Sequence, residues 1–396
     1  MTNPFQVKML KQPDGERLPI VLTRSTGTPF TPINEYLLYN LRSSSASSTM
    51  ENYARTITLL FWWGETQHIN MMDRLLSGEG FTMDQILVGL KDFLRKRLAT
   101  GGNEVINPNT LTERVLVIKN FVSYHLEAAI MRLDSTDPRI DRIRAKKDAL
   151  DAAFGRLTKE KFYPEQRYAL IEKEIGFLLE ITDPRSSANP WKPPCRSRNR
   201  LIILILLYIA IRRGELLNAY VSDCEINSPI PGIRIVRNPD NIIDPRRDKP
   251  NLKTKSRLIA IDRELASAID YYVQNDRYKI RNSHKTPFLI LNVYNGRPLS
   301  LRALNHVLEQ IKRRHPERFK SLFPHILRHT ALTRYREELK NKGCNDDEIA
   351  KHLQNLSGWA TDNSGTYTAA AIEAEGNRHS LKHQRNLFRR NEDVPF

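Results

Sequence analysis

The sequence has few cysteines and no long apolar segment. Its 396 residues include three cysteines, Cys195, Cys224 and Cys344, and they form no CxxC pair. A disulfide framework or a zinc knuckle is therefore not expected, and the composition is typical of a reducing cytosol. The longest apolar stretch, Leu201 to Ile211, is about half as long as the roughly 20 residues of a bilayer-spanning helix. Because the first residues also lack the layout of a signal peptide, we expect a cytoplasmic protein without a membrane segment.

Acidic residues are scarce relative to basic ones. The sequence has 45 Asp and Glu against 62 Lys and Arg, a formal net charge of +17. Its pI of about 9.8 is in the range of nucleic-acid-binding chains. Hydrophobic residues make up 40% and charged residues 27%, which is ordinary for a folded protein and unlike a disordered one. The charge indicates an acidic partner, with nucleic acid favoured over a membrane surface.

The first part of the chain is divided into three segments by its composition. Residues 1–30 contain scattered Pro and Gly without a sustained period, which predicts an N-terminal arm or tail. Residues 31–135 contain three or four helical patterns and predict a small all-helical domain; one pattern has the apolar stripe Val115, Ile118, Val122 and Leu126. Residues 136–163 alternate charges and contain few large apolar groups. They fit either a linker or a solvated helix of one domain.

A second domain is expected over residues 164–396, ending in a basic tail. It contains a buried helix around Leu201 to Leu217, and later helices at about 301–314, 325–341 and 346–356. Short strands are expected at 233–236, 258–261 and 288–293. The predicted fold class is therefore mainly α with a small β-sheet (α+β).

Four short segments of this second domain carry side chains that can bind an anion. Arg212 follows the apolar helix, with Glu215 placed to orient it, although the two residues taken alone favour a structural ion pair. His325 and Arg328 are three residues apart, a spacing that places both on one face of a helix. A basic run from Arg246 to Arg257 lies between two predicted strands. The fourth segment contains Gly358-Trp359 and, after a polar turn, Tyr367-Thr368.

The order of these segments is more specific than any one of them. R-R-G-E-L after an apolar helix, K-x-K-S-R in a hairpin, H-x-L-R-H-T, G-W and Y-T follow one another across about 164–371. In this order they resemble the tyrosine recombinase (phage integrase) family. The helical first domain also resembles, more loosely, the core-binding domain that clamps DNA in this family.

The resemblance implies a role for each of six residues. In this family a tyrosine attacks a scissile DNA phosphate and leaves a 3′-phosphotyrosyl link with a free 5′-hydroxyl. The implied roles are these: nucleophile, Tyr367; clamp on the non-bridging oxygens, Arg212 and Arg328; acid for the leaving 5′-oxygen, Lys253; general acid and base, His325; hydrogen-bond donor, Trp359. Planar guanidinium groups suit a phosphate bidentately, and an indole donates a single N–H.

Two assignments have competitors within this sequence. The hairpin is one residue shorter than is usual between its lysine and Arg257, so Lys255 competes with Lys253 as the acid. Tyr335 is a second tyrosine near the motifs, but its spacing with Ala331 and Leu339 predicts the interior of a helix. We therefore favour Tyr367 as the nucleophile.

The resemblance implies a site-specific recombinase that needs no cofactor or metal. We expect it to integrate or excise a mobile element and to be associated with the nucleoid in the cytoplasm. Its expected target is double-stranded DNA with inverted half-sites. Protomer contacts in a tetrameric synapse and an accessory DNA-bending protein are further expected partners. The alternatives are a resolvase for dimers or telomeres, and a catalytically inactive DNA-binding protein of the same fold.

Overall fold

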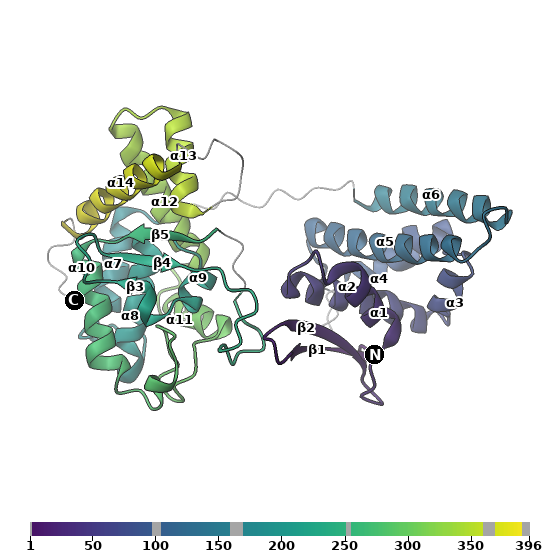
Figure 1. Ribbon diagram of the computed structural model, residues 1–396, viewed down its shortest axis with the longest axis horizontal. Coiled ribbons are helices and arrows are strands. Elements are labelled where there is room, and N and C mark those ends of the chain that lie inside the picture. Colours follow the sequence, from purple (N-terminus) through teal and green to yellow (C-terminus); the bar gives the residue numbers. More distant parts are fainter. Residues whose placement is uncertain (1, 97–103, 159–168, 251–254, 359–368, 390–396) are drawn as a thin grey trace. The chain divides into compact units, whose positions relative to one another are not determined.

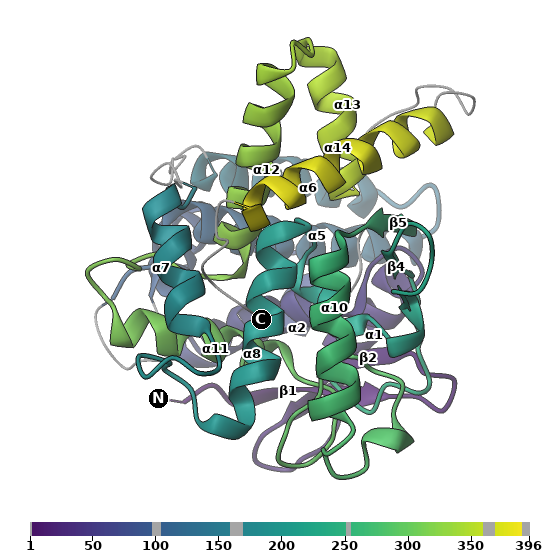
Figure 2. The same cartoon turned by 90° about the vertical axis from the view of Figure 1, so that its left-hand side faces the viewer.

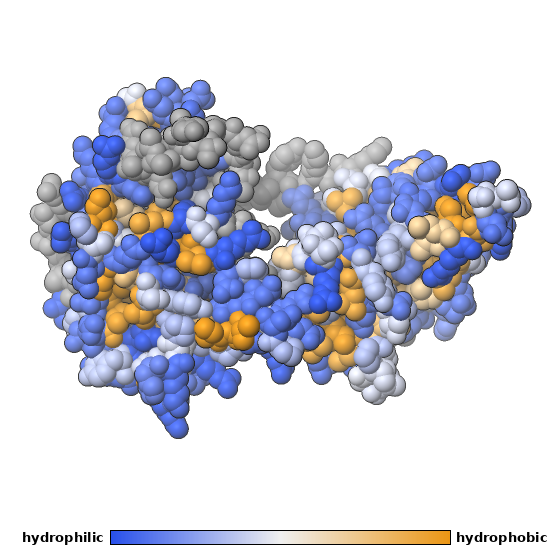
Figure 3. All heavy atoms as spheres, in the orientation of Figure 1, coloured by the Kyte–Doolittle hydropathy of each residue, from blue (hydrophilic) through white to orange (hydrophobic). Residues whose placement is uncertain are grey.

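The structure, a computed structural model, describes residues 2–96, 104–158, 169–250, 255–358 and 369–389. The chain forms two compact units, Met1–Glu165 and Gln166–Phe396 (Figure 1). Both are mainly helical and each contains one small antiparallel sheet, which confirms the predicted fold class. The surface in Figure 3 is mostly hydrophilic with scattered apolar spots. Within the described ranges, no helix has the length and apolarity to cross a membrane.

The N-terminal unit begins with a β-hairpin where the sequence predicted an arm. Its strands, β1 (Phe5–Lys11) and β2 (Arg17–Thr23), pair antiparallel. Phe5, Leu18 and Val21 are buried, and the Phe5 ring centroid lies 6.2 Å from that of Phe61 on α2 (Ser47–Thr66). A two-stranded hairpin is stable only when another element covers one of its faces. Here α2 supplies the cover, and a local sequence pattern does not reveal such a distant contact.

Helical segments complete this unit. In chain order they are α1 (Thr31–Tyr36), η1 (Leu37–Leu41), α2, α3 (Met71–Leu76), η2 (Gln85–Leu90), α4 (Lys91–Arg95), α5 (Pro108–Met131) and α6 (Arg139–Leu157). The apolar stripe predicted for α5 is buried in the core, as expected. Asn107 caps the N-terminus of α5, and its side chain accepts a hydrogen bond from the Thr110 amide at 2.8 Å.

The charged segment after residue 136 forms a helix of the N-terminal unit. Helix α6 packs against α5, and Ile143, Leu150 and Phe154 are buried in the core of this unit. Of the two interpretations that the sequence left open, the helix is therefore the one observed. Its charged residues alternate around a narrow apolar stripe, which is why composition alone also fitted a linker.

The C-terminal unit surrounds a three-stranded antiparallel sheet with helices (Figures 1 and 2). The strands, in the order β3-β4-β5, are β3 (Cys224–Glu225), β4 (Gly232–Ile235) and β5 (Arg257–Ala260). The helical segments are α7 (Glu172–Thr182), α8 (Pro193–Tyr208), α9 (Arg213–Asn218), η3 (Val221–Asp223), α10 (Arg263–Tyr271), η4 (Tyr272–Arg277), η5 (Ser283–Lys285), α11 (Leu301–Arg314), α12 (Pro324–Asn341), α13 (Asp346–Ser357) and α14 (Ala369–Arg389).

Most of these elements match the expectation from sequence, but two do not. The single helix expected around Leu201 to Leu217 is two helices, because α8 ends at Tyr208 and α9 begins at Arg213. The predicted strand at 288–293 is wrong, since Phe288 and Leu291 form only isolated bridges, to Tyr220 and Pro298 respectively. The segment is apolar because Phe288 to Leu291 are buried. An apolar run of this length indicates burial and does not by itself specify a strand ladder.

Two helices fix the part of this unit that carries the candidate site. Helix α8 is buried along its whole length from Arg198 to Tyr208, so it forms the centre of the core. Helix α14 packs on α12, α13 and β5 of its own unit (Figure 2). The side-chain amide of Gln384 holds it there, since it accepts from the Asp262 amide at 2.6 Å and donates to the Ala260 carbonyl at 3.0 Å.

Candidate active site

Arg212 stands at the point where the buried apolar segment meets helix α9. After α8, Ala210 adopts a left-handed conformation with φ of 52°, which is uncommon for a residue with a Cβ. This turn ends the helix, and the Ala210 carbonyl accepts a hydrogen bond from Nη1 of Arg328. Arg212 then caps α9, with its backbone amide donating to Oε2 of Glu215 at 2.7 Å. The local fold therefore holds the Arg212 backbone beside the Arg328 guanidinium.

Glu215 is a buried carboxylate among three arginines. Arg257 binds it bidentately, with Nη1–Oε1 of 3.0 Å and Nη2–Oε2 of 3.1 Å. Nη1 of Arg212 lies 3.6 Å from Oε1, and Nη1 of Arg328 lies 3.9 Å from Oε2. The Glu215 side chain is fully buried. A charge in this position is tolerated only because several opposite charges and hydrogen bonds surround it.

The same three arginines converge on the C-terminal end of α13. The Ser357 carbonyl accepts from Nη1 of Arg212 at 3.0 Å and from Nη2 of Arg328 at 2.9 Å. The Leu356 carbonyl accepts from Nε of Arg257 at 3.3 Å. The last carbonyls of a helix carry partial negative charge, so they attract the guanidinium groups.

Gly358 ends α13 in a position that only glycine fits. Its φ is 65°, and a Cβ there would lie 2.5 Å from Nη1 of Arg257. Backbone conformation and lack of space both require glycine. Gly358, the first residue of the predicted G-W motif, therefore has a structural role. Its missing side chain leaves room for the Arg257 guanidinium of β5 at the end of α13.

The cluster carries more positive than negative charge. Arg212, Arg257 and Arg328 face a single carboxylate, and the side chain of Arg328 is only 4% exposed. Burial, followed by the positive charge of Arg212, lowers the pKa of Arg328 to about 10. Arg212 is the open side of the cluster, with 35% of its side chain exposed. An anion that reaches Arg212 would relieve the repulsion, and a phosphate oxygen has the matching geometry.

His325 lies one helical turn before Arg328. Pro324 occupies the first turn of α12, which suits a residue without an amide hydrogen. His325 is exposed, whereas Arg328 is buried. The spacing thus places an exposed imidazole one helical turn before the buried Arg328, and an imidazole is a side chain that can exchange protons.

Three of the six predicted site residues lie outside the described residues: Lys253, Trp359 and Tyr367. The structure brings Arg212 and Arg328 together, and places His325 on the helix that carries Arg328. The competing Lys255 is exposed and lies two residues before β5. Tyr335 is fully buried and its hydroxyl donates to the Gly376 carbonyl at 3.1 Å, which confirms its assignment to the core.

Sequence reasoning missed Arg257. It identified Glu215 only as a partner of Arg212, whereas the shortest ion pair of Glu215 is with Arg257. In the sequence Arg257 is one base at the end of a basic run, 42 positions from Glu215. The one available signal was its position directly before the strand predicted at 258–261.

Comparison with known proteins gives matches to recombinases. A sequence profile of the phage integrase family matches residues 172–372, just over half of the chain. Tyrosine recombinase XerC of Staphylococcus carnosus is 27% identical over 211 residues, covering 53% of this chain and 58% of the relative. XerC of Staphylococcus haemolyticus is 24% identical over 294 residues, covering 72% and 80%. The chain thus spans little more than half the length of the first relative.

Solved structures give more distant matches. The integrase of the Tn1549 transposon in complex with transposon right end DNA has 16% identity and a TM-score of 0.49, covering 87% of this chain and 97% of that one. The XerH recombinase bound to difH substrate has 16% identity and a TM-score of 0.40, covering 94% and 99%. These values assign no role to any residue. Because the profile spans the elements that carry Arg212 and Arg328, and covers more than half of the sequence, the chain belongs to the phage integrase family.

Proposed function

We propose that the protein is a site-specific DNA recombinase that cleaves and rejoins strands through a 3′-phosphotyrosyl intermediate. The observation that carries this proposal is the pairing of Arg212 and Arg328 at one end of α13, around the buried Glu215. A phosphodiester undergoing displacement concentrates negative charge on its non-bridging oxygens. Two fixed guanidinium groups with a surplus of positive charge stabilise that state electrostatically.

The two arginines retain donors for a phosphate while they hold the site together. A guanidinium has five N–H donors, and the Ser357 carbonyl takes one from each arginine. Arg212, which is the more exposed, is proposed to make the first contact with the phosphate. Arg328 is held by the Ala210 carbonyl as well, so it supplies a fixed second contact.

The proposed reaction exchanges one phosphate ester for another. The phenolic oxygen of Tyr367 attacks phosphorus, the bond to the 5′-oxygen breaks, and Lys253 gives that oxygen a proton. His325 takes the proton of the phenol, and Trp359 donates its indole N–H to a phosphate oxygen. Rejoining is the reverse, with a 5′-hydroxyl as the nucleophile and the tyrosine as the leaving group. Because the number of ester bonds is unchanged, the step requires no energy source.

The N-terminal unit is proposed to act as the core-binding domain that clamps DNA. The net charge of +17 favours contacts with the backbone, so affinity should fall as salt rises. The target is proposed to be double-stranded DNA with inverted half-sites, bound by a tetrameric synapse with an accessory DNA-bending protein. We assign the reaction to the integration or excision of a mobile element, which inverted half-sites at an element boundary beside the gene would support.

A suicide substrate tests the proposed chemistry. This DNA carries a nick near the target phosphate, so that the released fragment diffuses away and the covalent protein–DNA adduct accumulates. We expect an adduct with the wild type, none with Tyr367→Phe, and DNA binding unchanged in that variant. Tyr335→Phe is the matched control and should still form the adduct. An adduct with Tyr367→Phe would move the nucleophile to another residue.

The same experiment separates an enzyme from an inactive DNA-binding protein of this fold. An inactive protein would retain binding and give no adduct with any substrate. To decide between the two hairpin lysines, the substrate is made with sulfur in place of the bridging 5′-oxygen, because a thiolate leaves without a proton. Rescue of Lys253→Ala supports the proposed acid, and rescue of Lys255→Ala instead would transfer that role.

A further inference from the structure

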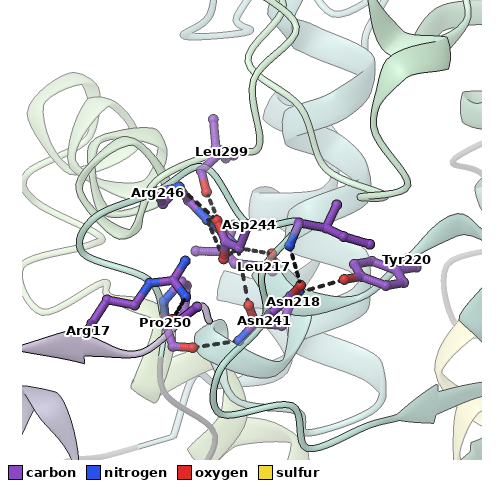
Figure 4. Close-up of polar contacts among 11 residues, drawn as sticks. Arg17, Leu217, Asn218, Tyr220, Asn241, Asp244, Arg246, Pro250 and Leu299 are labelled. Carbon is purple, nitrogen blue, oxygen red and sulfur yellow. Dashed lines mark hydrogen bonds and ion pairs between the residues drawn. The ribbon is translucent and has the colours of Figure 1, made fainter. Parts of the chain in front are cut away.

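The connection between β4 and β5 is anchored by a buried ion pair. Arg246 and Asp244 lie within this connection and bind each other, with Nε–Oδ1 of 2.9 Å and Nη2–Oδ2 of 2.8 Å (Figure 4). Their side chains are 8% and 0% exposed. Connections between strands usually run over the surface, where a charged pair stays solvated. This pair is instead buried in the C-terminal unit.

The guanidinium of Arg246 joins the connection to the C-terminal end of α9. Nη2 donates to the Leu217 carbonyl and to Oδ1 of Asn218, both at 3.1 Å, and Nη1 donates to the Leu299 carbonyl at 2.8 Å (Figure 4). Its Cζ also lies 4.9 Å from the centre of the Phe288 ring. Because these contacts come from separate parts of the chain, the position of Arg246 is fixed.

Asn218 extends this anchor to the residues that precede the proposed acid. Its Nδ2 donates to the Pro250 carbonyl at 2.6 Å. Pro250 is the last described residue before Lys253, which follows it three positions later in the sequence. After the hairpin, Arg257 binds Glu215. Both flanks of residues 251–254 are therefore attached to α9, the helix that Arg212 caps.

We propose that Arg246 and Asn218 are positioning residues for Lys253. They attach the residues that precede Lys253 to α9, the helix that Arg212 caps. The proposed acid and the proposed phosphate clamp are then both connected to the same helix. This inference rests on the proposed function. A buried ion pair is weak evidence of stabilisation, because desolvation offsets much of the attraction. A positioning role accounts for burying it in a connection that could otherwise be a simple turn.

The test compares two substrates in two variants. Asn218→Ala removes the contact with Pro250 and leaves the ion pair intact. The double variant Asp244→Asn/Arg246→Gln replaces the charged pair by amides and leaves no uncompensated charge in the interior. Each is assayed for adduct formation with ordinary suicide DNA and with DNA that carries the 5′-bridging sulfur. Lys253→Ala is the reference for loss of the acid.

Arg200→Gln is the matched structural control. Arg200 is a buried arginine that donates to the Leu179 carbonyl and to Oγ1 of Thr182, and so joins α8 to α7. It makes none of the contacts that anchor the hairpin. Its replacement should change adduct formation equally on both substrates, whatever the loss of stability.

We expect both variants to cleave ordinary DNA between about tenfold and 10²-fold more slowly, as small displacements of catalytic groups do. On the sulfur substrate their rates should return close to that of the wild type, as for Lys253→Ala. If Lys253→Ala is rescued while the anchor variants are slowed equally on both substrates, the positioning role is wrong and the proposed function stands. If the wild type forms no adduct with either substrate, the proposed function itself fails.

Discussion

The N-terminal unit buries mostly apolar side chains, whereas the C-terminal unit also buries many charged ones, of which some lie at its candidate site. In the described part of the N-terminal unit the buried polar residues are Arg17, Thr56, Thr58 and His125. Those of the C-terminal unit include Arg198, Arg200, Glu215, Asp244, Asp262, Arg277 and Arg328. Buried charge costs desolvation energy that an apolar core avoids. The C-terminal unit therefore bears this cost at more positions than the described part of the N-terminal unit, and at the candidate site the buried Glu215 and Arg328 belong to the arginine cluster.

Removing the carboxylate of Glu215 should have the largest effect. In Glu215→Gln, Arg212, Arg257 and Arg328 face one another without their common counter-charge. Loss of one partner of a buried pair costs about 3–5 kcal/mol, so the free energy of unfolding should fall by about that amount. We expect adduct formation to fall with it. Denaturant titration and the suicide substrate measure the two effects.

Sulfate distinguishes this loss from ordinary core damage. Phe61→Ala in the N-terminal core should also cost about 3–5 kcal/mol, through lost packing. Sulfate stabilises proteins in general, but in Glu215→Gln it can also occupy the uncompensated arginine cluster and so stabilise the folded state by binding. Relative to chloride at equal ionic strength, the gain should be larger for Glu215→Gln than for Phe61→Ala. Equal gains would mean that the cluster does not bind anions.

Arg212→Ala should mainly slow the chemistry. The side chain of Arg212 is 35% exposed, whereas that of Arg328 is 4% exposed. Removal of the Arg212 side chain therefore leaves no buried cavity. We expect adduct formation to be about 10²–10³-fold slower, the range seen when one electrostatic donor is removed. DNA affinity, measured by fluorescence anisotropy, should change little. Equal losses in rate and affinity would make Arg212 only an anchor for DNA.

Arg328→Ala sharpens the same comparison. It removes the Arg328 donor from the Ala210 carbonyl, whereas the Ser357 carbonyl keeps its donor from Arg212. We therefore expect a loss of unfolding free energy that Arg212→Ala does not show. The cost of leaving buried acceptors unsatisfied is about 1–3 kcal/mol. If both variants are equally stable, the buried position of Arg328 has no structural importance.

The order of motifs made Arg212 and Arg328 predictable, but not the network that joins them. Both arginines adjoin strong local patterns, an apolar run and a helix that starts with proline. The ion pair of Arg257 with Glu215 arises only when β5 packs beside α9. Local periodicity carries no information about which side chains meet across 42 positions.

The same distinction applies to the fold, in which some elements follow from the local sequence pattern and others depend on contacts between residues far apart in the sequence. The helix with a regular stripe, α5, was predictable because its apolar residues repeat every turn. The β1–β2 hairpin was not, because its stability depends on the ring of Phe61, which follows it in sequence by tens of residues. The anchor formed by Arg246 was likewise hidden, since its partners Leu217 and Leu299 come from separate segments.

Acid should weaken the N-terminal unit through His125. Burial, with a smaller contribution from Arg132, lowers the pKa of His125 from 6.5 to about 4, and within the described residues its Nε2 has no hydrogen-bond partner. On acidification His125 takes up a proton in the unfolded chain near pH 6.5, but in the folded chain only near pH 4. Its effect on stability is therefore absent above pH 6.5, and the free energy of unfolding decreases as the pH falls from 6.5 towards 4. The loss should be on the order of 3 kcal/mol.

His125→Phe tests this assignment. Its ring can keep the edge contacts that His125 makes with Phe121 and Tyr124, at centroid distances of 4.5 and 5.2 Å. Unfolding free energies of both proteins between pH 7.5 and pH 4 give the result, since carboxylates titrate equally in the two. The variant should lose less stability than the wild type over this window. Parallel curves would show that His125 is not the group that responds.

Gln384→Ala should give the smallest effect and should be confined to the attachment of α14. The Gln384 amide bonds backbone groups of Ala260 and Asp262, at and just after the end of β5, and also donates to the Ser380 hydroxyl within α14. The variant therefore loses two hydrogen bonds that attach the helix, worth about 1 kcal/mol each. We expect faster hydrogen exchange of α14 amides while those of α8 are unchanged. Lys382→Ala, at an exposed position of the same helix, is the control. If both variants accelerate exchange equally, α14 is held by its apolar contacts, and the C-terminal unit would in this respect resemble the N-terminal one.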